Sequence, residues 1–229
     1  VPIRRLAGRT LGLIGFGKVG GHVAKVCNAV GMTVLAYDPF LSPEHAQKAN
    51  VKLAEIDDVL TQSDFISLHC PLTEQTRNLI NAHAISKMKK GAYIVNCARG
   101  GIIDEAALAE AVKSGQIAGA GIDVFEKEPV TEGPLFGNDR ITLTPHLGAS
   151  TVEAQDRVGV DIANQFVAYF QEKRIENAVN VSQSSDPALQ PYVEVCRVLG
   201  KLAGQLISEP VTKMEGAVWG GLSGGRAQA

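Results

Sequence analysis

The sequence predicts an α/β fold in which helices cover both faces of a doubly wound parallel sheet. Three observations support this. The composition is that of an ordinary globular protein, and short apolar runs alternate with amphipathic segments through residues 10–149. Such alternation is typical of successive strand–helix–strand units. Helix-start signals also fall between the apolar runs. The predicted strands are residues 10–15, 32–37, 65–68, 92–96, 118–122 and 141–144.

The helices are predicted from amphipathic spacing and from their start signals. Ser42-Pro43-Glu44 has the pattern of an N-cap followed by proline at the first helical position. Asp104 and Glu105 place negative charge in a first turn, where the helix dipole favours it. Ser150 and Glu153 form a capping box that begins a long helix, extending to about residue 171. The other predicted helices are residues 19–30, 55–60, 82–88 and 104–114.

Composition and charge exclude several classes of protein. Of the 229 residues, 45% are hydrophobic and 20% charged, and the formal net charge is -2. Neither half of the chain is basic, so we expect no nucleic-acid or membrane partner. Apolar runs are too short for a membrane span. The scattered cysteines and histidines lack metal-ligand spacing, so no metal is expected, and free thiols favour a reducing, cytoplasmic location. The cysteines are Cys27, Cys70, Cys97 and Cys196.

Residues 15–20 match G-x-G-x-x-G between a predicted strand and a predicted helix. In this context Gly15 permits a tight turn, Gly17 lets the backbone approach a pyrophosphate, and Gly20 allows close helix–strand packing. Asp38 ends the next strand, where a carboxylate can accept from ribose hydroxyls and repels a 2′-phosphate. These features predict a Rossmann-type NAD-binding domain. The alternative is a glycine-rich turn, with an Asp38 that only caps its own turn.

Three further loops follow predicted strands, at the edge where open parallel sheets bind ligands. Arg99 follows one strand and can clamp a carboxylate, or it is a surface arginine. The next loop offers three carboxylates, and spacing does not distinguish among them. His146 follows the last strand, and its ordinary pKa near 6.5 suits proton exchange, although a structural histidine is the alternative. The three carboxylates are those of Asp123, Glu126 and Glu128.

With these motifs in family order, about residues 1–180 resemble the D-isomer-specific 2-hydroxyacid dehydrogenases. The segments that support the resemblance are the glycine loop with Asp38 and residues 97–105, 123–129 and 145–151. The resemblance implies Arg99 as the substrate arginine, His146 as the acid/base and Glu128 as its partner. The cofactor contacts predicted from it and from the glycine loop are Gly15, Gly17, Lys18, Val19, Gly20, Asp38, Cys70, Cys97, Ala98, Arg99, Asp123, His146, Gly148 and Ala149.

Within the family, residues 145–155 and 177–181 are most similar to the branch that oxidises 3-phosphoglycerate to 3-phosphohydroxypyruvate, the entry to serine biosynthesis. One alternative is a glyoxylate or hydroxypyruvate reductase. Another is a non-enzymatic NAD-sensing protein, as in the corepressors that share the fold.

The predicted organisation has three parts. Residues 1–149 form the NAD-binding domain, and residues 150–180 form the long helix and a return segment toward a substrate domain. Residues 181–229 form a linker and the start of a truncated domain, with a helix over 192–207 and a strand over 213–219.

The resemblance also implies what the chain lacks. Only 14 residues precede the glycine loop, where family members carry most of a substrate domain. Catalysis needs closure that excludes water, so we expect the chain alone to be weakly active or inactive. The resemblance implies a homo-oligomer, a dimer or tetramer in the full-length protein, acting on a small-molecule 2-hydroxy or 2-keto acid.

Overall fold

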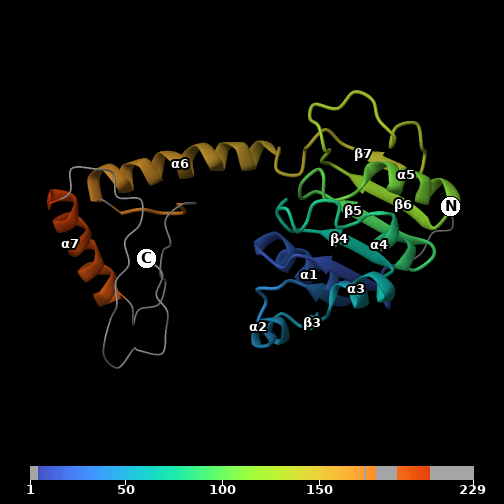
Figure 1. Cartoon of the computed structure of the whole chain (residues 1–229), viewed down its shortest axis with the longest axis horizontal. Coiled ribbons are helices and arrows are strands. Elements are labelled where there is room, and N and C mark those ends of the chain that lie inside the picture. Colours follow the sequence, from blue (N-terminus) through green and yellow to red (C-terminus); the bar gives the residue numbers. More distant parts are fainter. Residues whose placement is uncertain (1–4, 173, 179–189, 207–229) are drawn as a thin grey trace. The chain divides into compact units, whose positions relative to one another are not determined.

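The computed structural model describes residues 5–172, 174–178 and 190–206. Two compact units divide the chain, Val1–Gln155 and Asp156–Ala229. The first contains every described strand and the glycine loop (Figure 1).

The first unit is built on a seven-stranded, entirely parallel sheet with the strand order β3-β2-β1-β4-β5-β6-β7. The order reverses beside β1, which places a topological switch point between β1 and β4. The predicted fold class and six strands are confirmed. The two-residue β3 was not predicted, because so short an edge strand has no readable periodicity. The strands are β1 (Thr10–Ile14), β2 (Thr33–Tyr37), β3 (Lys52–Leu53), β4 (Phe65–Leu68), β5 (Ala92–Asn96), β6 (Ile117–Ile122) and β7 (Ile141–Leu143).

The first five helices lie between the strands and the last two follow β7, all close to the predicted positions. They are α1 (Lys18–Ala29), α2 (Pro43–Lys48), α3 (Ile56–Gln62), α4 (Ala82–Lys87), α5 (Glu105–Ser114), α6 (Val152–Glu172) and α7 (Gln190–Leu206). Ser42 and Asp104 are the N-caps of α2 and α5, as their sequences predict. The prediction for α6 is corrected by one residue. The Thr151 hydroxyl, rather than that of Ser150, accepts a hydrogen bond from the amide of Ala154 at 3.1 Å.

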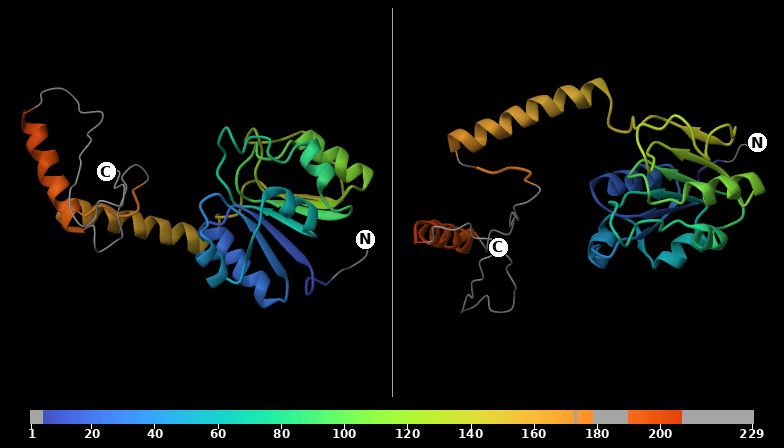
Figure 2. Two further views of the ribbon diagram at one scale, coloured as in Figure 1. Left: turned by 60° about the horizontal axis from the view of Figure 1, so that its bottom comes forward. Right: turned by 45° about the horizontal axis from the view of Figure 1, so that its top comes forward.

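One apolar cluster lies on each face of the sheet, between the strands and the helices that cover them. There are two clusters because successive side chains of a strand point to opposite faces. On β1, Leu11 and Leu13 pack into the cluster that contains Ala24 of α1. Ile14 packs into the larger cluster, to which α3, α4 and α5 contribute. Helices therefore lie on both faces of the sheet (Figure 2). Val95 of β5 belongs to neither cluster, and it is 37% exposed.

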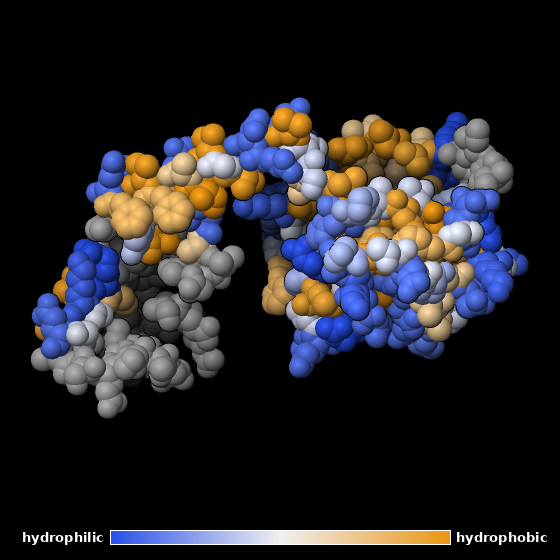
Figure 3. Space-filling model, turned by 90° about the horizontal axis from the view of Figure 1, so that it is seen from above, coloured by the Kyte–Doolittle hydropathy of each residue, from blue (hydrophilic) through white to orange (hydrophobic). Residues whose placement is uncertain are grey.

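In the second unit, α6 and α7 expose apolar side chains. Phe166 and Phe170 of α6 stack with ring centroids 6.2 Å apart, and both are exposed. Figure 3 shows apolar residues along the surface of α6. No described helix is both long and apolar enough to span a membrane. The predicted strand over 213–219 and most of the predicted linker lie outside the described residues.

Candidate active site

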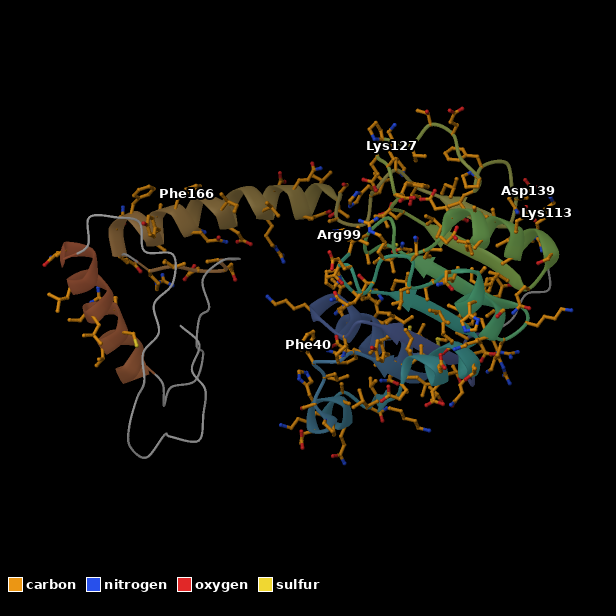
Figure 4. The ribbon with its side chains drawn as sticks, in the orientation of Figure 1. Phe40, Arg99, Lys113, Lys127, Asp139 and Phe166 are labelled. Atoms are coloured by element: carbon orange, nitrogen blue, oxygen red, sulfur yellow. The ribbon has the colours of Figure 1, made fainter. Side chains whose placement is uncertain are left out.

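Because all seven strands are parallel, the loops that follow them meet at one edge of the sheet. The glycine loop follows β1, and Asp38 follows β2. The loops of Arg99, of Glu128 and of His146 follow β5, β6 and β7. Figure 4 labels Arg99 beyond the strand ends and Lys127 in the loop that contains Glu128.

The glycine loop has the geometry of a phosphate cradle. Gly15 has φ +96°, and a Cβ there would lie 2.6 Å from the carbonyl carbon of His69. A Cβ on Gly20 would lie 2.6 Å from the carbonyl oxygen of Gly15, so β1 and α1 approach as closely as backbone allows. Gly17 differs, since a Cβ there would meet nothing within 4 Å. The space in front of Gly17 is therefore open to a ligand.

The N-terminus of α1 is suited to an anion, because no side chain among the described residues caps it. Gly17 is the N-cap, no side chain caps the helix, and its first turn holds no acidic residue. The free N–H groups and the positive end of the dipole favour a phosphate here. Lys18 and Val19 are exposed beside them.

Asp38 joins the glycine loop to its own turn. One carboxylate oxygen accepts the amide of Phe16 at 2.7 Å, and the other accepts the amide of Phe40 at 2.8 Å. The bond from Phe40 shows that Asp38 does cap its own turn, as the alternative interpretation expects. The bond from Phe16 goes further, because it connects Asp38 to the glycine loop 22 residues earlier. A carboxylate has about four acceptor sites, so two remain for the hydroxyls of a ribose.

His146 and Glu128 are joined by a hydrogen bond across two loops. Nδ1 of His146 lies 2.8 Å from Oε2 of Glu128, while Oε1 of Glu128 accepts the amide of Phe125 at 2.9 Å. The bonds from His146, and secondly from Phe125, lower the pKa of Glu128 below its ordinary value. Glu128 is therefore ionised at neutral pH, and it fixes the imidazole so that Nε2 is the nitrogen left for a substrate.

Of the three carboxylates that follow β6, only Glu128 pairs with His146. Glu126 is oriented elsewhere, because its amide donates to Glu105 at 2.9 Å and its carboxylate lies 3.9 Å from Arg77. Asp123 is 3% exposed and lies beneath the histidine loop. Spacing alone left this choice open.

The buried carboxylate of Asp123 organises the histidine loop. It accepts the Thr144 hydroxyl at 2.5 Å and the amides of Leu147 and Gly148 at 2.7 Å each. Burial acts to raise the pKa of Asp123, but these three bonds outweigh it, and the pKa is lowered. An ionised carboxylate has about four acceptor sites, so about one site of Asp123 stays unused. The predicted contact with the cofactor requires such a site.

His146 itself has an uncommon backbone. Its φ is +58°, in the left-handed region that non-glycine residues seldom occupy. The backbone carbonyl of Asp123 accepts its amide at 2.8 Å, which helps to hold this conformation. Strained residues of this kind cluster at functional sites.

The arginine loop is fixed by a residue that the sequence analysis missed. Asn96, the last residue of β5, is 2% exposed; its side-chain oxygen accepts the amide of Ala98 and its nitrogen donates to the carbonyl of Arg99, both at 3.0 Å. The sequence feature that could have identified Asn96 is a polar residue at the end of an otherwise apolar strand. Gly100 presses against the next loop, where any Cβ would overlap the carbonyl of Phe125. The arginine and glutamate loops are thus in backbone contact.

The remaining predicted cofactor residues lie at the same edge. Cys70 follows β4 and is half-buried, while Cys97 is exposed after β5. Burial is the main cause that raises the pKa of both thiols, so neither is an activated nucleophile. Ala98 is half-buried, and Gly148 and Ala149 are exposed in the histidine loop.

The chain fits a dinucleotide at this edge. The open space before Gly17, the uncapped start of α1 and the spare acceptor sites of Asp38 match a pyrophosphate and a ribose. The residue after Asp38 is Pro39, and residues 39–47 contain no lysine or arginine that could bind a 2′-phosphate. This set of groups fits NAD.

Comparisons with known proteins agree with this geometry. Residues 1–148 match the model of the D-isomer specific 2-hydroxyacid dehydrogenase, NAD binding domain. A D-3-phosphoglycerate dehydrogenase of Synechocystis sp. is 44% identical over 218 residues, which cover 94% of this chain and 39% of that protein. The chain therefore spans about two fifths of that relative's length.

Solved structures have the same fold. A glyoxylate reductase from Paecilomyes thermophila superposes with a TM-score of 0.71 at 36% identity, covering 77% of this chain and 54% of that chain. The NAD-complexed form of a D-isomer specific 2-hydroxyacid dehydrogenase from Lactobacillus delbrueckii ssp. bulgaricus has a TM-score of 0.67 at 32% identity, with coverages of 76% and 56%. The family model spans more than half of the chain. The pair formed by His146 and Glu128 and the glycine loop of this chain lie at the edge of the sheet where a dinucleotide fits. The chain belongs to the D-isomer specific 2-hydroxyacid dehydrogenase family, and residues 1–148 are its NAD-binding domain.

Proposed function

We propose that the protein to which this chain belongs is an NAD-dependent dehydrogenase of D-2-hydroxy acids. Its preferred reaction is the oxidation of 3-phosphoglycerate to 3-phosphohydroxypyruvate, which supplies serine biosynthesis. The observation that supports this most directly is the 2.8 Å contact between His146 Nδ1 and Glu128 Oε2, at the edge where the glycine loop lies. The substrate follows from the similarity to D-3-phosphoglycerate dehydrogenases.

In this proposal Arg99 binds the substrate carboxylate. Its guanidinium is exposed, and one Nη1–H donates to the carbonyl of Ala98 at 2.6 Å. A guanidinium has five N–H donors in a planar fork, so donors remain for a carboxylate and an adjacent oxygen. These contacts hold C2 of the substrate in front of the nicotinamide site.

His146 exchanges the hydroxyl proton. In the oxidation direction, neutral His146 accepts this proton at Nε2, because its Nδ1–H is held by Glu128. The resulting imidazolium is stabilised by the ionised carboxylate 2.8 Å away. NAD, when bound, supplies the hydride acceptor. In the reverse direction the imidazolium returns the proton to the oxygen of the 2-keto acid.

Lys18, Val19 and the glycine loop hold the pyrophosphate in this proposal, and Asp38 holds the adenine ribose. Residues from Cys97 to Arg99, with Asp123 and residues 146–149, line the nicotinamide side. The three-part organisation belongs to the same proposal: a cofactor domain over 1–149, a helix and return segment over 150–180, and the start of a further domain after 180.

We infer the wider context from the family. The protein acts in the cytoplasm on a small-molecule acid, does not bind nucleic acid, and is a homo-oligomer. The exposed apolar residues of α6 are available for such association.

A glyoxylate or hydroxypyruvate reductase is the second candidate, because a glyoxylate reductase superposes on 77% of this chain. The two differ in the group beyond C2, where phosphoglycerate carries a phosphate. Initial rates with 3-phosphoglycerate and NAD, and with glyoxylate or hydroxypyruvate and NADH, separate them. A larger kcat/KM for the phosphorylated acid is expected.

The proton-transfer role is tested with His146→Gln. General acid–base catalysis contributes about 10²–10⁴-fold to a rate, so kcat falls by this factor. NADH affinity falls far less than kcat, because the glycine loop and Asp38 still hold the rest of the cofactor. Turnover equal to that of the unsubstituted protein contradicts the role of His146. In an NAD-sensing protein, the same substitution leaves partner recruitment intact.

A further inference from the structure

We infer that Asn96 is a positioning residue for Arg99, holding the substrate-binding arginine in place through a closed ring of hydrogen bonds. This rests on the proposed function, since Arg99 is taken to bind the substrate carboxylate. Asn96 itself contacts neither substrate nor cofactor in this inference.

The ring has three members and three bonds. The amide of Ala98 donates to Oδ1 of Asn96 at 3.0 Å, and Nδ2 of Asn96 donates to the carbonyl of Arg99 at 3.0 Å. Nη1 of Arg99 then donates to the carbonyl of Ala98 at 2.6 Å. Asn96 thus connects both to the backbone of Arg99 and to the residue on which its guanidinium rests.

Burial makes this arrangement specific to asparagine. Asn96 is 2% exposed, one of four buried polar or charged residues among those that the structure describes. An amide side chain supplies an acceptor and a donor at once, which neither a carboxylate nor an apolar side chain can do. A buried polar group left without its partner is costly, so the segment 97–99 would rearrange if Asn96 were replaced.

The strand anchors the ring to the rigid part of the fold. The carbonyl of Asn96 accepts the amide of Asp123 at 2.9 Å, and Leu68 of β4 pairs with Asn96 in register. Gly100, directly after Arg99, is pressed against the carbonyl of Phe125. Arg99 is therefore held on one side by Asn96 and on the other by the loop of Glu128, which aligns the carboxylate-binding and proton-transfer groups.

The test measures oxalate binding to the NADH complex of this chain, read from NADH fluorescence. Oxalate presents a carboxylate beside a second planar pair of oxygens, as a 2-keto acid does. We expect Asn96→Leu to raise the dissociation constant of oxalate about tenfold or more. The dissociation constant of NADH should rise by a clearly smaller factor, because the glycine loop and Asp38 lie outside the segment that rearranges. NADH binding shows at the same time that the variant is folded.

A double-mutant cycle separates positioning from general damage. If Asn96 acts through Arg99, Asn96→Leu has no further effect on oxalate in the Arg99→Ala background. Additive losses overturn the inference, as does an unchanged oxalate affinity or a loss of NADH affinity equal to that for oxalate.

Gln116→Leu is a matched control. Gln116 precedes β6 at the opposite edge of the sheet, and its side-chain nitrogen donates to the carbonyls of Ile85 and Met88 at 3.2 and 2.9 Å. This variant loses a comparable amide but should bind oxalate normally. Equal loss in both variants contradicts a specific role for Asn96.

A second variant keeps the test informative if Asn96→Leu is unstable. In Asn96→Asp, a protonated carboxyl can donate to the carbonyl of Arg99, whereas an ionised one cannot. The oxalate affinity, taken as a ratio to that of the unsubstituted chain, should therefore recover as the pH is lowered. If the ratio of the oxalate affinities of the variant and the unsubstituted chain does not change with pH, the inference that Asn96 positions Arg99 is overturned.

Failure of the proposed function gives a different result. If oxalate does not bind the unsubstituted NADH complex, or if Arg99→Ala leaves its affinity unchanged, the role of Arg99 fails, and the inference fails with it. If Arg99→Ala weakens oxalate binding but Asn96→Leu does not, only the inference fails.

Discussion

The carboxylate of Asp123 and the hydroxyl of Thr144 are joined by a 2.5 Å hydrogen bond that connects the ends of β6 and β7. The same carboxylate accepts the amides of Leu147 and Gly148, and the backbone carbonyl of Asp123 accepts the amide of His146. The loop that contains His146 is therefore built around a buried anion. Its geometry depends on groups that do not take part in the proposed proton transfer.

Removing the hydroxyl of Thr144 should destabilise the chain. Thr144→Val keeps the shape but deletes one of three donors to a buried carboxylate. Hydrogen bonds to charged groups contribute about 1.5–3 kcal/mol, so the free energy of unfolding, measured with urea, should fall by this amount. Thr142→Val, on the exposed side of β7, is the control and should change it little. Equal losses in both variants would contradict the special role of Thr144.

Stability should depend on pH through Asp123. Its pKa is lowered in the folded chain, so its contribution is fully present above the unfolded pKa of about 3.9 and is lost as pH falls through the lower folded value. We expect the free energy of unfolding to decrease with acidification in this range. Glu128, whose pKa is also lowered, contributes in the same direction above its own unfolded value.

The Asp123→Asn variant isolates this effect. It cannot titrate, so its unfolding free energy should vary less with pH below about pH 5. The difference between the variant and the unsubstituted chain should be largest near neutrality and should shrink in acid. Urea unfolding at several pH values measures it. A difference that is constant with pH would show that the charge of Asp123 is not what stabilises the loop.

The sequence was sufficient for six of the seven strands, because apolar alternation and the G-x-G-x-x-G spacing are local patterns. It was not sufficient for contacts that depend on how three loops meet. Spacing did not distinguish Glu128 from Glu126, whereas the fold brings only Glu128 to within 2.8 Å of His146. Asn96 was missed for the same reason, since both of its partners lie in a turn whose shape no periodicity encodes. The cap of α6 was displaced by one residue, because Ser150 and Thr151 carry the same chemistry.

Asp38 should determine the choice between NAD and NADP. Fluorescence titration of this chain should give tight NADH binding and much weaker NADPH binding, because a 2′-phosphate would meet the carboxylate. Asp38→Asn removes the repulsion and should bring the dissociation constants of NADH and NADPH closer together. Asp58→Asn, an exposed residue of α3, is a control for the loss of one negative charge. Equal affinities for both cofactors in the unsubstituted chain would contradict the assignment of Asp38.

Gly17 should be dispensable for folding and required for cofactor binding. Its φ is -79°, which any residue can adopt, and a Cβ there would meet nothing within 4 Å. Gly17→Ala should leave the free energy of unfolding unchanged or raise it by about 0.4–1 kcal/mol, because the unfolded chain becomes less flexible. The added methyl group would occupy the space proposed for the pyrophosphate, so NADH affinity should fall by about tenfold or more. Gly15→Ala is the contrasting variant, since φ is +96° and its Cβ would lie 2.6 Å from the carbonyl carbon of His69. It should lower the free energy of unfolding as well as NADH affinity. If Gly17→Ala bound NADH normally, the dinucleotide would have to lie elsewhere than against this loop.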